Sequence, residues 1–247
     1  MLSKAQIKYI HSLRNKKYRQ RSGRFIVEGL KPVGELLKEN HIRVEGIFAL
    51  EDWMQKHASP GSSHPEVVVT PVSEQELKQI STLETPQAVL AICEIPEPIP
   101  VDPSGRITLA LESVRDPGNL GTIIRIADWF GLKAIVCSPD CADTYHPKTI
   151  QATMGSIARV RVAALSLEAW LDQYSHVPVL AAMLEGEPVT AFSGIKEAIL
   201  IIGNESRGLT PEVVSRASRR ITIPRLGGAE SLNAAIATAI LVERLLL

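Results

Sequence analysis

The residues best suited to chemistry stand in three short polar blocks in the second half of the chain, each at the end of an apolar run. The blocks are Asp116-Pro117-Gly118-Asn119-Leu120-Gly121 with Arg125, Gly203-Asn204-Glu205-Ser206-Arg207-Gly208, and Ile223-Pro224 followed by Ser231-Leu232-Asn233. They supply a carboxylate, an arginine and neutral amides and hydroxyls, which are groups that can move a proton or stabilise a developing charge. Because the crevice of an α/β sheet lies at the carboxyl ends of its strands, three such junctions in order predict one active site there.

Short, nearly continuous apolar runs must position these blocks, and they predict strands of a parallel sheet that is buried on both faces. We expect these strands at residues 107–111, 133–137, 177–183, 198–202 and 220–223. Helical patterns cover residues 122–130, which end at the candidate left-handed cap Gly131, and residues 232–247, with Ser231 as a candidate N-cap. The small residues from 233 to 239 permit close approach of another backbone, or simply close packing in a core.

The first part of the chain predicts a smaller α/β unit. Apolar runs at 25–27, 44–50, 67–69 and 88–92 alternate with helical patterns at 31–38 and 73–79. Four prolines then fall between residues 94 and 105, a stretch that can continue neither a helix nor an interior strand. We therefore expect a first domain over residues 1–94, a linker over 95–105 and a second domain over 106–247.

A net charge of zero hides a strongly basic N-terminal segment. Residues 1–24 hold eight of the 27 Lys and Arg residues and none of the 27 Asp and Glu residues, so the rest of the chain carries a net charge of minus eight. Cations attract a phosphate backbone, and the interleaved rings of Tyr9 and Tyr18 can stack on exposed bases. The alternative is an ordinary solvated helix, because apolar residues of the segment also recur at helical spacing. These are Ile7, Ile10 and Leu13.

Composition excludes several classes of protein. Hydrophobic residues make up 45% of the 247 residues, which is ample for a buried core. No apolar signal region opens the chain and no stretch approaches 18 apolar residues, so we expect a cytoplasmic protein without a membrane segment. The three cysteines lack metal-site spacing, so we expect reduced thiols and no metal. No P-loop and no glycine-rich dinucleotide fingerprint is present, which counts against NAD as a cofactor.

The three blocks, in this order and at these spacings, resemble the signature motifs of the SpoU-type (TrmH-like) RNA 2'-O-ribose methyltransferases of the SPOUT superfamily. The motifs lie within residues 111–125, 201–209 and 221–237. A fourth stretch, residues 146–156, is similar to the family's loop and helix between the first two motifs. Upstream, Lys16-Lys17-Tyr18-Arg19, Phe25-Ile26-Val27-Glu28-Gly29 and Thr85-Pro86-Gln87 are similar to the substrate-binding domain of many members.

This resemblance implies an α/β fold with a C-terminal SPOUT-type parallel sheet, a deep trefoil knot and a smaller N-terminal α/β RNA-binding domain. It also implies S-adenosylmethionine as the cofactor and a homodimer, because members build the active site at a subunit interface. We expect 2'-O-methylation of ribosomal RNA of the 23S type, with transfer RNA as the nearer alternative. Two rivals are a non-catalytic RNA-binding or ribosome-assembly protein that retained the fold, and a small-molecule α/β enzyme.

The resemblance and the basic segment together assign the candidate site residues. The expected catalytic residues are Asn119, Arg125, Glu205, Ser231 and Asn233. The expected cofactor-binding residues are Gly203, Asn204, Ile223, Pro224 and Leu232. The expected RNA-binding residues are Lys8, Arg14, Lys16, Lys17, Arg19, Arg21 and Arg24.

The roles of some of these residues stay open at this point. A guanidinium stays charged and accepts no proton in ordinary circumstances, so we expect Arg125 to bind a phosphate and stabilise negative charge, while a phosphate oxygen or a carboxylate takes the proton. Glu205 is the nearest carboxylate, but ordering its loop is an equally good role. Gly203 allows a backbone to approach a ligand, whereas Ile223 suits a core strand as well as a cofactor contact.

Several residues depart from the usual family pattern and make the target less certain. These are Ala88, Gln151, Thr153, Arg225 and Ala234-Ala235.

Overall fold

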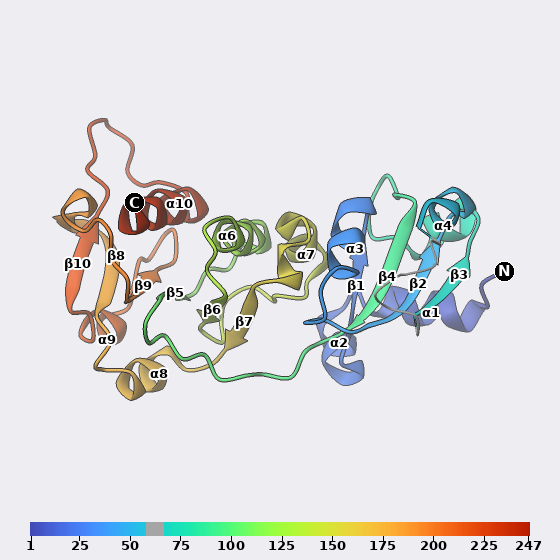
Figure 1. Ribbon diagram of the computed structural model, residues 1–247, viewed down its shortest axis with the longest axis horizontal. Helices are drawn as coiled ribbons and strands as arrows, with labels where there is room; N and C mark the ends of the chain where they lie inside the picture. The colour runs from blue at the N-terminus through green and yellow to red at the C-terminus, as the bar shows by residue number, and fades with distance from the viewer. Residues whose placement is uncertain (58–66) are drawn as a thin grey trace. The chain divides into compact units, whose positions relative to one another are not determined.

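The computed structural model describes residues 1–57 and 67–247 of the chain (Figure 1). The chain divides into two compact units. The first unit comprises Met1–Glu97 and Asp143–Arg159, and the second comprises Pro98–Ala142 and Val160–Leu247. The segment 143–159 therefore belongs to the first unit by its contacts, although it stands between two strands of the second in the sequence. Among the described residues no helix could span a membrane, and the three cysteines are free and buried.

A six-stranded parallel sheet forms the centre of the second unit, with strand order β10-β8-β9-β5-β6-β7. Its strands are β5 (Ile107–Leu111), β6 (Ala134–Cys137), β7 (Arg161–Ala164), β8 (Val179–Pro188), β9 (Ala198–Ile202) and β10 (Arg219–Thr222). Every residue of β5 and β9 is buried, as their continuous apolar runs predict. Because the strands are parallel, their carboxyl ends lie at one edge of the sheet, and the three polar blocks follow β5, β9 and β10 there.

Helices cover both faces of this sheet (Figure 1). On one face α6 (Pro117–Trp129) packs beside α10 (Ala234–Leu246), and on the other α8 (Leu167–Gln173) packs beside α9 (Pro211–Val214). Alternate strand residues such as Ala110, Val136 and Ile199 form a buried cluster with Trp170 of α8. A short 3-10 helix, η2 (Val189–Ala191), follows β8.

The first unit holds a four-stranded mixed sheet of order β1-β4-β2-β3. Its strands are β1 (Arg24–Glu28), β2 (Val44–Ala49), β3 (Val68–Pro71) and β4 (Val89–Glu94). Its helices are α1 (Lys4–Ser12), α2 (Lys16–Ser22), α3 (Leu30–Leu36), α4 (Glu51–His57), α5 (Glu74–Ile80), α7 (Pro147–Thr153) and the 3-10 helix η1 (Ser156–Ala158). Ile10 of α1 and Leu77 of α5 pack on Ile26 and Leu90 of the sheet. On β1 alternation points Phe25 to the opposite face, where its ring contacts Tyr145.

Three of the differences from the sequence-based expectation have a clear physical reason. Helix α6 begins at Pro117, five residues earlier, because Asp116 caps it by accepting from the Asn119 amide (2.8 Å) and proline suits the first turn. The last helix is capped by Asn233 and not by Ser231: the side-chain Oδ1 of Asn233 accepts from the amides of Ala235 (2.9 Å) and Ile236 (3.3 Å). Strand β7 was not predicted, since as an edge strand with exposed end residues it lacks a continuous apolar run.

Candidate active site

The three polar blocks meet through one side chain, Asn119, in the first turn of α6. Its Nδ2 donates to Oε1 of Glu205 (2.6 Å), and its Oδ1 accepts from Nδ2 of Asn233 (2.9 Å). The partners stand 86 and 114 positions from Asn119 in the sequence. A chain of hydrogen bonds, Glu205–Asn119–Asn233, therefore joins all three blocks at the carboxyl edge of the parallel sheet.

Asn204 orders the loop that carries Glu205. Its Oδ1 accepts from the amides of Ser206 (2.9 Å) and Arg207 (3.1 Å), and its Nδ2 donates to the carbonyl of Ser113 (2.8 Å). The side chain thus folds the second block and attaches it to the turn that precedes the first block. This use of the amide makes Asn204 a positioning residue of the site.

Gly203 is required by the loop itself. A Cβ atom at this position would lie 2.6 Å from the backbone carbon of Gly208 and 2.8 Å from the Leu209 nitrogen. The loop closes there because the amides of Asn204 and Gly208 donate to each other's carbonyls (3.1 and 2.9 Å). The sequence suggested that the missing side chain admits a ligand, whereas the geometry shows that it admits the returning backbone.

Glu112 is a residue of this region that sequence reasoning missed. Its side chain is 5% exposed, and its two carboxylate oxygens accept from the hydroxyl (2.6 Å) and the amide (2.9 Å) of Thr210. Thr210 in turn caps α9 through the Val213 amide. The carboxylate therefore connects the end of β5 to the end of the second block. The available signal was an acidic residue directly after a nearly continuous apolar run, since a buried carboxylate requires donors.

The turn after β5 is stabilised by a second carboxylate. Ser113 adopts a positive φ of 56°, which is unusual for a residue with a side chain. Its hydroxyl donates to Asp140, as does the hydroxyl of Ser138 (2.6 Å), and Arg115 pairs with the same carboxylate (2.9 Å). Hydrogen bonds from Ser113 and Ser138, with help from Arg115, lower the pKa of Asp140 to about 2. The carboxylate thereby holds a strained turn in place.

Arg125 lies on the exposed surface of α6, six residues or about 9 Å along the helix from Asn119. It makes no hydrogen bond and no ion pair with any residue in the part of the chain that the structure describes. Ser231 is also exposed, in the connection from β10 to α10. The structure thus brings Asn119, Glu205 and Asn233 into contact, and leaves Arg125 and Ser231 open to solvent.

The connection between β10 and α10 has the chemistry of a nucleoside site. Within the described residues, positions 223–232 make no backbone–backbone hydrogen bond. The carbonyls of Ile223 and Ala229 accept from the side chains of Thr222 (3.4 Å) and Arg225 (3.3 Å), and the other main-chain groups are available to a ligand. Ile223 is half-buried, Pro224 is exposed and Leu232 is 45% exposed, so apolar side chains accompany the unpaired main chain. An adenine ring needs main-chain donors and acceptors together with apolar contact. These residues therefore fit an adenosine-containing cofactor.

Arg19 corrects one prediction about the basic segment. Its side chain is 1% exposed, and its guanidinium donates to the carbonyls of Leu13 and Arg14 (both 2.8 Å) and to Asp143 (2.5 Å). A buried guanidinium with these partners stabilises the first unit and cannot contact RNA, so the assignment of Arg19 to RNA was wrong.

The other basic residues fall into two groups. Arg24 pairs with Glu45 (2.5 Å) and Glu94 (3.0 Å), and Arg14 donates to the carbonyl of Ser81, so both already have partners within the unit. The other cations that were assigned to RNA are exposed on α1 and α2. They are Lys8, Lys16, Lys17 and Arg21.

Both parts of the chain match known protein families. Residues 106–243 match the SpoU rRNA Methylase family, and residues 4–91 match the MRM3-like substrate binding domain. The 23S rRNA (guanosine(2553)-2'-O)-methyltransferase RlmP of Bacillus subtilis (strain 168) is 32% identical over 243 residues, which cover 97% of this chain and 95% of that protein.

Solved structures with the same fold match this chain over nearly its whole length. A TrmH-family structure from Porphyromonas gingivalis is 40% identical, with a TM-score of 0.88 over 99% of this chain and 98% of that one. An AdoMet-bound rRNA methyltransferase from Sinorhizobium meliloti is 31% identical, with a TM-score of 0.87 over 99% and 95%. The matched residues, the shared fold and the joined motifs lead to one conclusion: this chain belongs to the SpoU rRNA methylase family.

Proposed function

We propose that the protein transfers a methyl group from S-adenosylmethionine to a ribose 2'-hydroxyl of 23S ribosomal RNA. The observation that carries this proposal is the Glu205–Asn119–Asn233 hydrogen-bond chain, which joins the three family motifs into one site. The Bacillus relative is named for 23S rRNA, and so is a Streptomyces viridochromogenes relative that is 28% identical over 94% of this chain. Their names specify different nucleosides, guanosine and uridine, so the proposal extends to the RNA and not to the base.

Transfer RNA is the weaker alternative. Two solved structures whose descriptions mention tRNA cover only 57% of this chain, with TM-scores of 0.52 and 0.51. The 23S rRNA relatives match both units. The presence of the substrate-binding domain therefore favours ribosomal RNA as the substrate.

S-adenosylmethionine supplies an electrophilic methyl group on a sulfonium when it is bound. We assign its binding to Gly203, Asn204, Ile223, Pro224 and Leu232. The main-chain groups of residues 223–232 that do not bond to Thr222 or Arg225 fit the adenine and ribose edges, and the exposed apolar side chains fit the faces of the ring. Gly203 and Asn204 contribute by fixing the adjoining loop.

In-line displacement at the methyl carbon requires a positioned ribose oxygen and removal of its proton. Arg125 remains charged, so it binds the adjacent phosphate and stabilises negative charge on the ribose oxygen. Glu205 already accepts from Asn119, which favours a role in ordering the loop, and a phosphate oxygen of the RNA then receives the proton. Ser231 and Asn233 supply hydrogen-bonding groups that orient the nucleotide.

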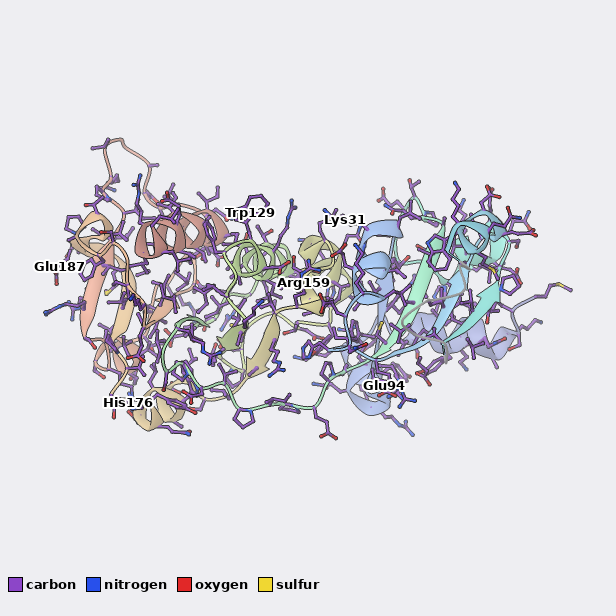
Figure 2. The ribbon with its side chains drawn as sticks, in the orientation of Figure 1. Lys31, Glu94, Trp129, Arg159, His176 and Glu187 are labelled. Carbon is purple, nitrogen blue, oxygen red and sulfur yellow. The ribbon has the colours of Figure 1, made fainter. Side chains whose placement is uncertain are left out.

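We infer that the active form is a homodimer. Trp129 of α6 is 85% exposed and Ile236 of α10 is 54% exposed, so this helical layer presents apolar side chains that a second copy can cover (Figure 2). Arg125 lies on the same helix as Trp129 and finds no partner among the described residues. In a dimer, Arg125 of one subunit would act at the active site of the other subunit.

The domain organisation that we propose follows that of the family. We propose an RNA-binding domain over residues 1–94, a linker over 95–105 and a methyltransferase domain over 106–247, in a cytoplasmic protein. The family matches at residues 4–91 and 106–243 support this division. We also propose the deep trefoil knot, since the chain leaves the edge strand β10 and returns to pack α10 against α6, which follows β5 at the centre of the sheet.

The test is transfer of labelled methyl from S-adenosylmethionine to separated RNA fractions from a strain that lacks this gene. Label in the 23S fraction supports the proposal, and label confined to tRNA supports the alternative substrate. RNA binding without methyl transfer to any fraction or ribosomal particle would establish a binding protein instead. A small-molecule enzyme would show neither property.

A further inference from the structure

The segment Asp143–Arg159 is attached to the first unit by an ion pair at each end. At its start Asp143 pairs with the buried Arg19 of α2 (2.5 Å), and at its end Arg159 pairs with Glu35 of α3 (2.5 Å). The side chains of the second pair are 29% and 20% exposed. Partly buried pairs are screened less by salt than surface pairs, so both ends are held firmly.

Contacts between the two ends show that the segment is docked along its length. The ring of Tyr145 lies 4.7 Å from that of Phe25 of β1. Gly155 has a φ of +97°, and a Cβ atom there would lie 2.8 Å from Cβ of Glu35 and 3.3 Å from Cα of Pro32. The backbone therefore lies directly on α3, which only glycine allows. The hydroxyls of Thr149 and Thr153 are buried and bond within the segment.

The docked segment lies beside the exposed cations of α2. Arg19 lies on the inner side of α2 and compensates the charge of Asp143, whereas Lys16, Lys17 and Arg21 are on its exposed side. The segment adds the exposed Lys148. Residues 1–24 contain no acidic residue, so this part of the surface favours a phosphate backbone.

His146 adds a neutral donor to the same surface. Its Nδ1 accepts from the Lys148 amide (3.1 Å), which leaves the proton on Nε2. Burial and the nearby charge of Arg19 lower the pKa of His146, so the imidazole is neutral at physiological pH. Neutral donors beside cations suit the mixture of phosphates, hydroxyls and base edges in RNA.

We infer that residues 143–159 form part of the RNA-binding surface of the first unit, and that Arg19–Asp143 and Glu35–Arg159 are positioning pairs that hold them there. This inference rests on the proposed function. The chain between β6 and β7 of the methyl-transfer unit passes through this segment, so the same residues that contact RNA are covalently continuous with the catalytic sheet. The pairs therefore set the affinity for RNA and leave the affinity for the methyl donor unchanged.

The test is charge reversal at the more accessible pair. Glu35→Arg and Arg159→Glu should each raise KM for a 23S rRNA transcript by about tenfold, with kcat and the Kd for S-adenosylmethionine within about twofold of wild type. The double variant E35R/R159E restores the pair with reversed charge, so its KM should return to within about threefold of wild type. Lys38→Ala is the matched control, because it removes the other partner of Glu35, just after α3, and leaves the segment attached.

Hydrogen exchange separates docking from RNA contact. Amides of residues 146–156 should exchange faster in Arg159→Glu than in wild type. In Lys38→Ala their exchange rates should equal those of wild type. Faster exchange with an unaltered KM and an unaltered Kd for the transcript would overturn the RNA role, and unaltered exchange would overturn the positioning role. If the wild-type protein methylates no RNA, the proposed function fails, while the gel-shift Kd values of wild type and variants still decide this inference.

Discussion

Asn119 is an amide whose two ends are both used, since it donates to Glu205 and accepts from Asn233. An aspartate in its place could not donate and would repel Glu205, and a hydroxyl is too short to span both partners. The chemistry of the position therefore explains why an asparagine stands there. The same chain of contacts gives Asn233 two separable roles, as the N-cap of α10 and as the donor to Asn119.

Asn233→Asp separates these two roles. An aspartate keeps an oxygen to cap α10 but loses the Nδ2 donor, so the melting temperature should stay within a few degrees of wild type while methyl transfer falls about tenfold or more. Thermal unfolding and initial rates on rRNA measure the two effects. Asn233→Ala is the control, since it should lose both stability and activity. Wild-type activity in Asn233→Asp would show that the link to Asn119 is unimportant.

Asp140 predicts a pH dependence of stability. Its pKa in the folded protein is about 2, below the ordinary value of 3.8, because Ser113 and Ser138 donate to the carboxylate. A lowered pKa means that this stabilisation is present above about pH 4 and disappears as the pH falls toward 2. The difference in free energy of unfolding between wild type and Asp140→Asn should therefore shrink from pH 5 to pH 2. The side chain is 46% exposed, so solvent reduces the size of the effect. A difference that does not change with pH would refute this assignment.

At this scale the sequence could predict residues that stand in contiguous motifs, such as Asn119, Glu205 and Asn233. It could not predict that Arg19 is buried, because its partner Asp143 is 124 positions away. Ser231 and Asn233 are both good capping residues, and only the structure shows that Oδ1 of Asn233 accepts from the first amides of the helix. The positioning role of Glu112 also depends on a partner, Thr210, that is 98 positions away.

Among the elements, the central strands were the most predictable part of the fold. Strands β5 and β9 are buried on both faces, so their apolar runs are unambiguous, whereas the edge strand β7 carries a mixed sequence. The helical layer of α6 and α10 leaves the large apolar side chains of Trp129 (85%) and Ile236 (54%) exposed. Helical periodicity does not predict these exposed side chains, because it assigns apolar residues to the face that packs on the core of the same chain.

Ile236→Glu tests whether a second copy covers α10. A carboxylate in an apolar interface has no partner, so the variant should elute as a monomer in light-scattering chromatography and lose most of its methyl transfer. Its unfolding should remain cooperative, because Ile236 is 54% exposed in the single chain. Val68→Glu on β3, where the side chain is 67% exposed, is the matched control and should leave the assembly unchanged. A dimeric, active Ile236→Glu protein would exclude this face as the interface.

For the whole molecule, the basic segment is built into the fold of the first unit. Ile10 and Leu13 belong to its buried core and Arg19 is buried as well. Removal of the first 24 residues would therefore unfold the unit, and its effect on RNA binding would be uninterpretable. The apolar side of this segment forms core and its charged side is exposed, as the solvated-helix alternative predicts, and contact of the charged side with RNA stays a prediction.

Substitution of exposed cations is the appropriate test of RNA binding. The variant K16A/K17A/R21A should weaken binding to an rRNA transcript and reduce the slope of log K against log salt concentration by about 2, as expected when three phosphate contacts are lost. Filter binding over a range of salt concentrations measures this slope. The control variant R106A/K133A/R161A removes three exposed charges next to the amino ends of β5, β6 and β7, away from the site. Equal effects of both variants would point to nonspecific attraction.

The central claim is that this site methylates one ribose of 23S rRNA. The most direct measurement is a map of 2'-O-methyl groups on 23S rRNA from a strain that lacks the gene, after incubation with S-adenosylmethionine and either wild-type protein or Arg125→Ala. We predict a single new 2'-O-methyl group with the wild-type protein, and a yield at least about a hundredfold lower with the variant. Absence of any new methyl group on free rRNA or on ribosomal particles, or equal yield with the variant, would contradict the account.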